Sequence, residues 1–217
     1  MFKISNIRKE TDEKWVYLKC DIEVTGMNCP FAEKNMWMAV EPDMGKWLDT
    51  AVYDPFVLVP LILGMFYHQD VHIDGNISPK LYHNVQHYLM KIFDNFSPKT
   101  APIKFTVNGF DTISGEPGHM IGTGISCGVD SLTTIYDNFV LEDDPNFKIN
   151  NLFFVNTGSH GDYGEKSLKR FEDRATLNRG AADDLGLPMH LINSNFHPKV
   201  PSFYTKDHVG TGTSISS

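Results

Sequence analysis

Beyond residue 118, short apolar runs alternate with longer stretches of helical periodicity. Strand-like and helix-like patterns follow one another at residues 119–126, 130–140, 152–157, 165–186 and 189–193. Such alternation is typical of a parallel sheet whose strands are joined by crossover helices. The sequence therefore predicts an α/β fold for this part of the chain.

The first 110 residues carry a different mixture of patterns, and we expect a small α+β segment there. Strand-like runs occupy residues 15–25, 35–40 and 103–107. The stretch after residue 108 is rich in turn-forming residues. We therefore place a boundary between an N-terminal segment, 1–110, and a second domain, 111–217.

Two helices are expected within the N-terminal segment. Asp54-Pro55 predicts the start of a helix that runs to Tyr67, with Asp54 as its N-cap. Ser78-Pro79 repeats the same signal. The second helix has an apolar stripe made of Leu81, Val85, Leu89 and Ile92.

Composition excludes several classes of function. The formal net charge of −8 disfavours a large nucleic-acid surface. Three cysteines without a CxxC pair fit a reducing compartment better than a disulfide scaffold. No signal-peptide pattern opens the chain, and the apolar run 56–67 is too short to span a bilayer. We expect a cytoplasmic protein that does not act at a membrane.

The stretch Gly124–Ser131 joins the first strand of the second domain to its first helix. The first N–H groups of a helix have no intrahelical partner, and the helix dipole favours negative charge at that end. Ser126 and Ser131 add two hydroxyl groups beside these amides. The sequence therefore predicts a phosphate-binding loop here, the alternative being an ordinary turn between a strand and a helix.

Two common phosphate motifs do not describe this loop. A Walker A motif needs GxxxxGK[ST], and no lysine follows these glycines. A dinucleotide fingerprint needs GxGxxG, and Cys127 stands where its third glycine would be.

A third pattern fits better. Residues 126–131, Ser-Cys-Gly-Val-Asp-Ser, resemble the SGGxDS signature of the PP-loop ATP pyrophosphatases, a superfamily that includes GMP synthetase, asparagine synthetase, the 7-cyano-7-deazaguanine synthases and tRNA thiolation enzymes. The resemblance extends over residues 118–195, where Phe153–Gly158 is similar to the family's second strand and Arg174–His190 to the following helix and strand entry. It is nearest to the deazaguanine synthase and asparagine synthetase type of domain.

The resemblance implies a Rossmann-like (HUP-type), doubly wound parallel sheet that binds ATP and Mg²⁺. In that family a carboxylate or carbonyl oxygen attacks the α-phosphate, pyrophosphate leaves, and a nitrogen or sulfur nucleophile then attacks the adenylated carbon. By this resemblance Asp130 and Ser131 are the catalytic residues and Asp130 lies near the metal. The nucleotide-binding residues are Ser126, Cys127, Gly128, Val129, Asp130 and Ser131 in the loop and Val155 and Asn156 at the end of the second strand.

Cys127 departs from the family pattern, which has a glycine at this position. If the position requires a positive φ, a cysteine is strained there, and the loop is then modified or defective. A thiol at a helix N-terminus can also be reactive. The alternative is a small residue that is tolerated because it faces the strand.

Three further residues lie where the ends of parallel strands form a ligand-binding edge. His160 and Asp162 follow the second strand, and Asn193 ends the third. They are candidates for substrate contact. The alternative for His160 and Asp162 is a plain glycine-rich loop, and the alternative for Asn193 is a polar turn. His83 and His87 have the spacing of a zinc-binding pair, but the glutamate of HExxH is missing, so we expect a solvated helix face and no metal.

The sequence thus predicts an AMP-forming ATP pyrophosphatase or ligase that acts on a small carboxylate or carbonyl acceptor with a nitrogen or sulfur donor. Two alternatives stay open: a nucleotide-binding or assembly module without catalysis, and a tRNA-modifying enzyme, which would need a basic surface. A homo-oligomer is compatible with the sequence. Residues 209–217 look like the start of another element, and we expect an incomplete domain.

Overall fold

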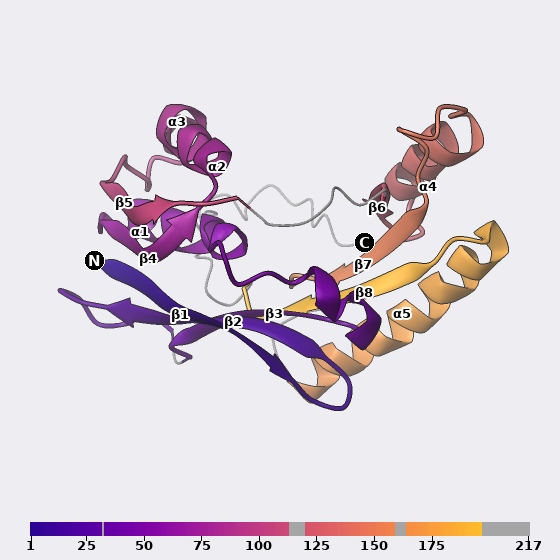
Figure 1. Ribbon diagram of the computed structural model, residues 1–217, viewed down its shortest axis with the longest axis horizontal. Helices are drawn as coiled ribbons and strands as arrows, with labels where there is room; N and C mark the ends of the chain where they lie inside the picture. The colour runs from indigo at the N-terminus through magenta and orange to yellow at the C-terminus, as the bar shows by residue number, and fades with distance from the viewer. Residues whose placement is uncertain (32, 113–119, 159–163, 197–217) are drawn as a thin grey trace, which may run out of the picture.

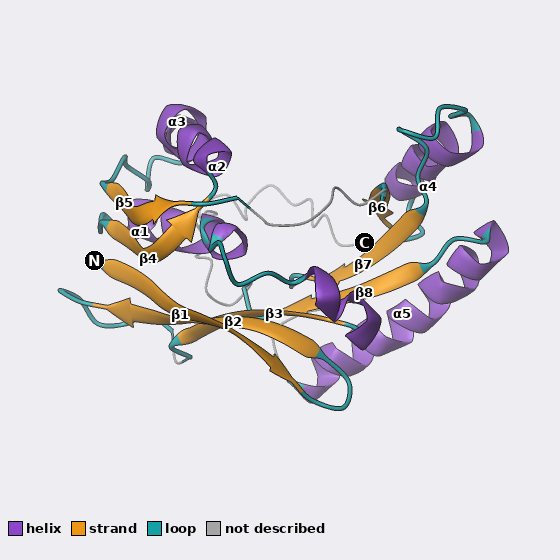
Figure 2. Ribbon diagram, viewed as in Figure 1, coloured by secondary structure: helices purple, strands orange, loops and turns teal. Residues whose placement is uncertain are grey.

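A computed structural model describes the chain except for residues 32, 113–119, 159–163 and 197–217. Its centre is an eight-stranded sheet with the strand order β5-β4-β1-β2-β3-β8-β7-β6. Helices pack against this sheet, which confirms the α/β class (Figures 1 and 2). The sheet is mixed, because parallel and antiparallel pairs both occur in it.

The N-terminal half contributes five strands: β1 (Phe2–Thr11), β2 (Val16–Val24), β3 (Asn35–Val40), β4 (Val71–Ile77) and β5 (Phe105–Phe110). The first three form an antiparallel meander, and β4 and β5 continue the sheet in parallel beside β1. The strands expected at 15–25, 35–40 and 103–107 are thus present within a few residues.

The helices of this half agree with the sequence only in part. After the 3-10 helix η1 (Pro42–Trp47) comes a second 3-10 turn, η2 (Asp54–Phe56), and α1 spans Leu58–Tyr67. The prediction that Asp54 caps this helix is wrong. Its Oδ1 accepts a hydrogen bond from the backbone N–H of Ser78 at 2.8 Å, so the carboxylate ties two segments together instead.

The second predicted helix is one continuous rod made of α2 (Pro79–Asn84), the π-helical turn η3 (Val85–Leu89) and α3 (Met90–Phe96). Its N-cap is confirmed, because Ser78 Oγ accepts a hydrogen bond from the N–H of Leu81 at 3.2 Å. The expected stripe ends early, since Ile92 is 56% exposed while Met90 is buried. A π-turn inserts one extra residue and rotates the face that follows it.

The C-terminal half has the alternating order that the sequence predicts. It runs β6 (Gly122–Gly124), α4 (Val129–Ile135) with its π-helical extension η4 (Tyr136–Val140), β7 (Asn151–Asn156), α5 (Glu165–Leu185) and β8 (Met189–Ser194). The three strands are parallel. Gly186, at φ 68°, ends α5 in the left-handed conformation that glycine favours.

The two halves share one sheet, because β3 pairs antiparallel with β8. The sequence suggested a domain boundary between residues 110 and 111. In the chain this position falls between β5 and β6, which form the two opposite edges of the same sheet.

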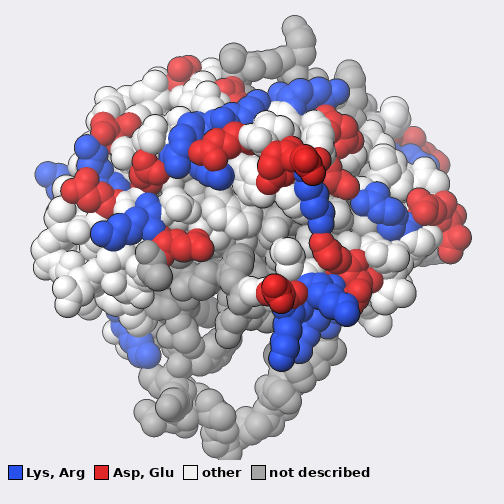
Figure 3. Space-filling model, turned by 90° about the horizontal axis from the view of Figure 1, so that it is seen from below, with Lys and Arg blue, Asp and Glu red and all other residues white. Residues whose placement is uncertain are grey.

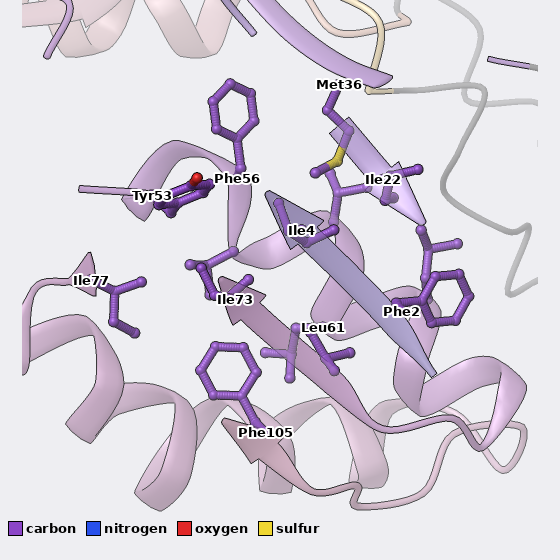
Figure 4. Close-up of a cluster of buried hydrophobic side chains, with 14 of the residues drawn as sticks. Phe2, Ile4, Ile22, Met36, Tyr53, Phe56, Leu61, Ile73, Ile77 and Phe105 are labelled. Carbon is purple, nitrogen blue, oxygen red and sulfur yellow. The ribbon is translucent and has the colours of Figure 1, made fainter. Parts of the chain in front are cut away.

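Two cores lie on opposite faces of the sheet. Two residues of β3 that are three positions apart, and so face opposite sides, show this: Met36 belongs to the core under α1 and α3, and Ala39 to the core under α4 and α5. Figure 4 shows the first core, where Phe2 and Ile4 of β1 meet Ile73 of β4 and Leu61 of α1. In the second, Phe154 of β7 stacks on Phe171 of α5 with ring centroids 5.3 Å apart.

Among the described helices, none has both the length and the apolar composition needed to cross a membrane.

Candidate functional site

The site begins where β6 ends. Ile125 is buried and its N–H donates to the carbonyl of Phe153 at 2.9 Å, which anchors the loop to the neighbouring strand. The chain then turns through Cys127, whose φ is 54°, and enters α4 with Gly128 as N-cap at φ −86°. The left-handed residue of this loop is therefore the cysteine and not the glycine.

Gly128 does not need to be glycine for steric reasons within the chain. A Cβ placed on it would lie 3.5 Å from Ser126 Oγ, an ordinary van der Waals contact. The interpretation from sequence, that Gly128 allows a ligand to come close to the backbone, stays a prediction.

Two serine hydroxyls hold the loop in shape. Ser131 Oγ donates to the carbonyl of Gly128 at 3.0 Å and lies 3.1 Å from Ser126 Oγ. The backbone N–H groups of Ser126 and Gly128 donate to these hydroxyls at 3.3 and 3.4 Å. The serines therefore connect the two ends of the turn to each other.

Four backbone amides of the loop are left without a partner in the described part of the chain: those of Cys127, Val129, Asp130 and Ser131. No side chain caps this helix, and α4 continues directly into η4. Unpaired N–H groups at a helix start form an environment that favours an anion.

The loop forms one wall of a cavity of about 800 Å³. Ligand sites for small molecules typically measure about 300–1,000 Å³. Three elements line it: the loop, strand β7 and helix α5. The lining residues are Gly124, Ile125, Ser126, Cys127, Gly128, Asp130, Ser131, Phe153, Phe154, Val155, Arg174, Leu177 and Asn178.

Helix α5 brings a cation and a buried amide to this cavity. Arg174 is exposed, and its guanidinium forms no ion pair within the described residues. One turn further on, Asn178 is 5% exposed, and its Nδ2 donates to the carbonyl of Arg174 at 2.8 Å. Its Oδ1 is buried and lacks a hydrogen-bond partner. An unpaired buried acceptor of this kind costs about 1–3 kcal/mol.

Most of the loop residues predicted from the sequence surround the cavity. Ser126, Cys127, Gly128, Asp130 and Ser131 line it, and so does Val155 on β7. Val129 does not line it, and its side chain is 80% exposed.

Other predicted residues lie elsewhere. Asn156 and Asn193 are both buried at the ends of β7 and β8, where Asn156 Nδ2 donates to Asn193 Oδ1 at 2.9 Å. Neither lines the cavity, and the pair ties the two strands together. His160 and Asp162 lie outside the described residues.

Sequence reasoning did not find the wall that α5 contributes. A signal for it existed: the buried stripe of this helix contains Phe171, Ala175 and Ala182, and Asn178 interrupts it with an amide. A polar residue at a core-facing position, one turn from an arginine, is the pattern that would have indicated a site there.

The residues at the loop fit a magnesium ion that arrives with a nucleotide. The described residues hold no group of three or more His, Cys, Asp or Glu that could bind a metal by itself. Mg²⁺ is usually held by one or two carboxylates together with phosphate oxygens and water. The exposed carboxylate of Asp130, which makes no hydrogen bond or ion pair with described residues, is suited to that role.

The surface charges are mixed on the face of the molecule that Figure 3 shows. Lysine and arginine side chains alternate there with aspartate and glutamate. Lys14 pairs with Glu172 of α5, and Arg8 pairs with Glu10 and Asp21. This face therefore does not present the continuous basic surface that RNA binding requires.

Comparison with known proteins adds no further assignment, since no protein-family model, curated protein or solved structure matches this chain.

Proposed function

We propose that this protein binds ATP at the loop 126–131 and transfers AMP to a carboxylate or carbonyl oxygen of a small acceptor, with release of pyrophosphate. The observation that carries the proposal is the cavity lined by Cys127 and Asp130, whose amides are unpaired among the described residues, beside the hydroxyls of Ser126 and Ser131. The resemblance of residues 126–131 to the SGGxDS signature supports it. In this proposal the parallel unit β6–β8, with α4 and α5 over one face, is a Rossmann-like nucleotide-binding unit of the PP-loop type.

The loop residues act by position and charge. The acceptor oxygen attacks the α-phosphorus of ATP, an O–P bond forms, and the bond to the pyrophosphate oxygen breaks. Negative charge on the leaving pyrophosphate is stabilised by the loop amides and by the hydroxyls of Ser126 and Ser131. The carboxylate of Asp130 would hold Mg²⁺, and the ion would supply positive charge that neutralises phosphate oxygens. A nitrogen or sulfur nucleophile then displaces AMP from the activated carbon.

A second candidate is a nucleotide-binding module without catalytic activity. The left-handed φ of Cys127 favours it, because a side chain in this conformation strains the loop. ATP binding without pyrophosphate release in the presence of acceptor acids would identify this module.

The test is calorimetric titration of ATP and Mg²⁺ into the wild-type protein and two variants. Asp130→Asn removes the carboxylate assigned to Mg²⁺, and Ser131→Ala removes a hydroxyl contact to phosphate. We expect each to weaken binding by about 1–3 kcal/mol, as for loss of a hydrogen bond to a charged group. Pyrophosphate release with a mixture of small carboxylic acids tests the chemical step.

Thr133→Ala is the matched control, because Thr133 is exposed on the same helix but does not line the cavity. It should bind ATP as the wild type does. Unchanged affinity in both loop variants, or no ATP binding by the wild type, would contradict the proposal.

A further inference from the structure

The α5 wall of the cavity, Arg174 and Asn178, has no part in the phosphate chemistry described above. Both residues line the same cavity as the loop. They stand four residues apart on one helix, so their side chains are neighbours, with Cβ atoms about 5–6 Å apart. A ligand that touches one can therefore touch the other.

Asn178 differs from the other buried asparagines of the described chain. Asn156 and Asn193 bond to each other, and Asn195 bonds through both atoms of its amide group. Asn178 uses only Nδ2, and its Oδ1 is the one buried side-chain polar atom of the described residues that lacks a partner.

Folding gives no reason for an asparagine at this position. The neighbouring positions of the buried stripe hold Phe171, Ala175 and Ala182, which leave no polar atom unpaired. A leucine of similar size would fill the same space without a desolvated acceptor. An unfavourable polar group that persists beside a cavity is best explained by a ligand that satisfies it.

Arg174 supplies a positively charged hydrogen-bond donor, where Asn178 supplies an acceptor. Arg174 lines the cavity from the same helix, and its guanidinium has no carboxylate partner among the described residues. Guanidinium groups bind carboxylates through two parallel N–H···O bonds. The α5 wall therefore combines a positively charged hydrogen-bond donor, the Arg174 guanidinium, with a neutral hydrogen-bond acceptor, Asn178 Oδ1.

We propose that Arg174 and Asn178 form the acceptor subsite and take a small carboxylic acid that carries an N–H or O–H donor next to its carboxylate. Arg174 binds the carboxylate, and Asn178 Oδ1 accepts a hydrogen bond from the donor. The inference rests on the proposed function, because it assigns the acceptor of that reaction. Oδ1 is covered in the free protein, so entry of the donor includes a small shift of the surrounding side chains.

The subsite discriminates between acids of equal size. An acid without the donor leaves Oδ1 unpaired in the complex, as it is in the free protein. A 2-hydroxy or 2-amino acid pairs it, and a site built to pair a ligand N–H or O–H rejects the analogue that lacks it. Propionate, lactate and alanine form a matched set for this comparison, together with their homologues that have longer side chains.

The experiment measures binding of these acids without ATP, by calorimetry and by the shift in melting temperature. We expect the wild type to bind the 2-hydroxy and 2-amino acids about tenfold more tightly than the plain acids. Arg174→Gln should weaken binding of all of them about tenfold. Asn178→Leu should abolish the preference and raise the melting temperature of the unliganded protein.

Arg170→Gln is the matched control, because Arg170 is exposed on α5 one turn earlier and does not line the cavity. It should keep both affinity and preference. The preference surviving in Asn178→Leu, or no binding of any of the acids, overturns the inference.

Titration of ATP into the same variants separates this inference from the proposed function. ATP affinity should be unchanged in Arg174→Gln and Asn178→Leu. A loss in both would assign the wall to the nucleotide and overturn the acceptor subsite. Acid binding with the expected preference in a protein that does not bind ATP would refute the proposed function and leave the subsite standing.

Discussion

Cys127 is the strained residue of the candidate site. Its φ of 54° lies in the left-handed region, which costs a residue with a side chain about 1–2 kcal/mol. The neighbouring glycine, at φ −86°, has a conformation that any residue adopts. The sequence suggested strain at Cys127 if this position had a positive φ, and the structure gives it that backbone.

Cys127→Gly should therefore stabilise the protein. Relief of the strain is offset by the larger conformational freedom of glycine in the unfolded chain, about 0.4–1 kcal/mol, which leaves a net gain of about 0.5–1 kcal/mol. Urea denaturation measures the difference. As a control, Gly128→Ala should be tolerated, since its φ is negative and its Cβ would meet only Ser126 Oγ. A less stable Cys127→Gly variant would show that the thiol makes a favourable contact.

At the level of single residues, the sequence located the loop because its parts are adjacent in the chain. The turn, the two hydroxyls and the helix start all lie within residues 126–131. Arg174 and Asn178 join them across a separation of more than 40 residues. Only the packing of α5 beside β7 brings these two side chains to the cavity.

Among the elements, the β1–β2 hairpin shows how one carboxylate shapes a turn. Asp12 Oδ1 accepts hydrogen bonds from the N–H groups of Lys14 and Trp15, both at 2.8 Å. These bonds favour the charged form and lower the pKa of Asp12 below its ordinary value. Burial and the same carboxylate raise the pKa of Tyr17, on the following strand, to about 12.

The contribution of Asp12 should depend on pH. A carboxyl group whose pKa is lowered by folding stabilises the protein above its unfolded pKa, about 3.9 for aspartate. The contribution disappears as the pH falls through the lower, folded value. We expect the wild type to be more stable than Asp12→Asn at pH 7, and the stabilities of the two proteins to converge in acid. Thermal unfolding between about pH 2 and pH 7, in steps of about one pH unit, measures the difference. A difference that does not change with pH would contradict this assignment.

The elements themselves were largely predictable where local signals are strong. Ser78 caps its helix as expected, and Gly186 ends α5. Asp54 failed as a cap because a tertiary partner, the N–H of Ser78, competes for its carboxylate. Ile92 failed as a core residue because the π-turn Val85–Leu89 changes the helical phase, a feature that regular periodicity does not contain.

For the whole molecule, the junction of the two halves, where β3 pairs with β8, is held by buried polar groups as well as by strand pairing. Asn195 is 1% exposed. Its Oδ1 accepts from the N–H of Trp37 at 2.8 Å, and its Nδ2 donates to Glu33 Oε2 at 2.8 Å and to the carbonyl of Asn35 at 3.1 Å. The residue after β8 is thereby bonded to β3 and the segment before it.

Asn195→Ala should therefore destabilise the entire fold. Removing these bonds leaves at least one buried group unpaired, which costs about 1–3 kcal/mol. Because one sheet joins the halves, tryptophan fluorescence and far-UV circular dichroism should report the same urea midpoint. Asn146→Ala, in an exposed turn, is the control and should change the midpoint little. Two separate transitions would show that the halves fold independently.

The sequence by itself determined the strand–helix alternation of the second half, the capped helix at Ser78 and the local chemistry of the loop. All of these depend on neighbours within a few residues, where periodicity, caps and turn chemistry operate. The tertiary structure decided that β1 joins the sheet, that β3 pairs with β8, and that α5 completes the cavity with Arg174 and Asn178. These features depend on contacts between residues distant in sequence, which burial and hydrogen-bond pairing select only once the whole chain is packed.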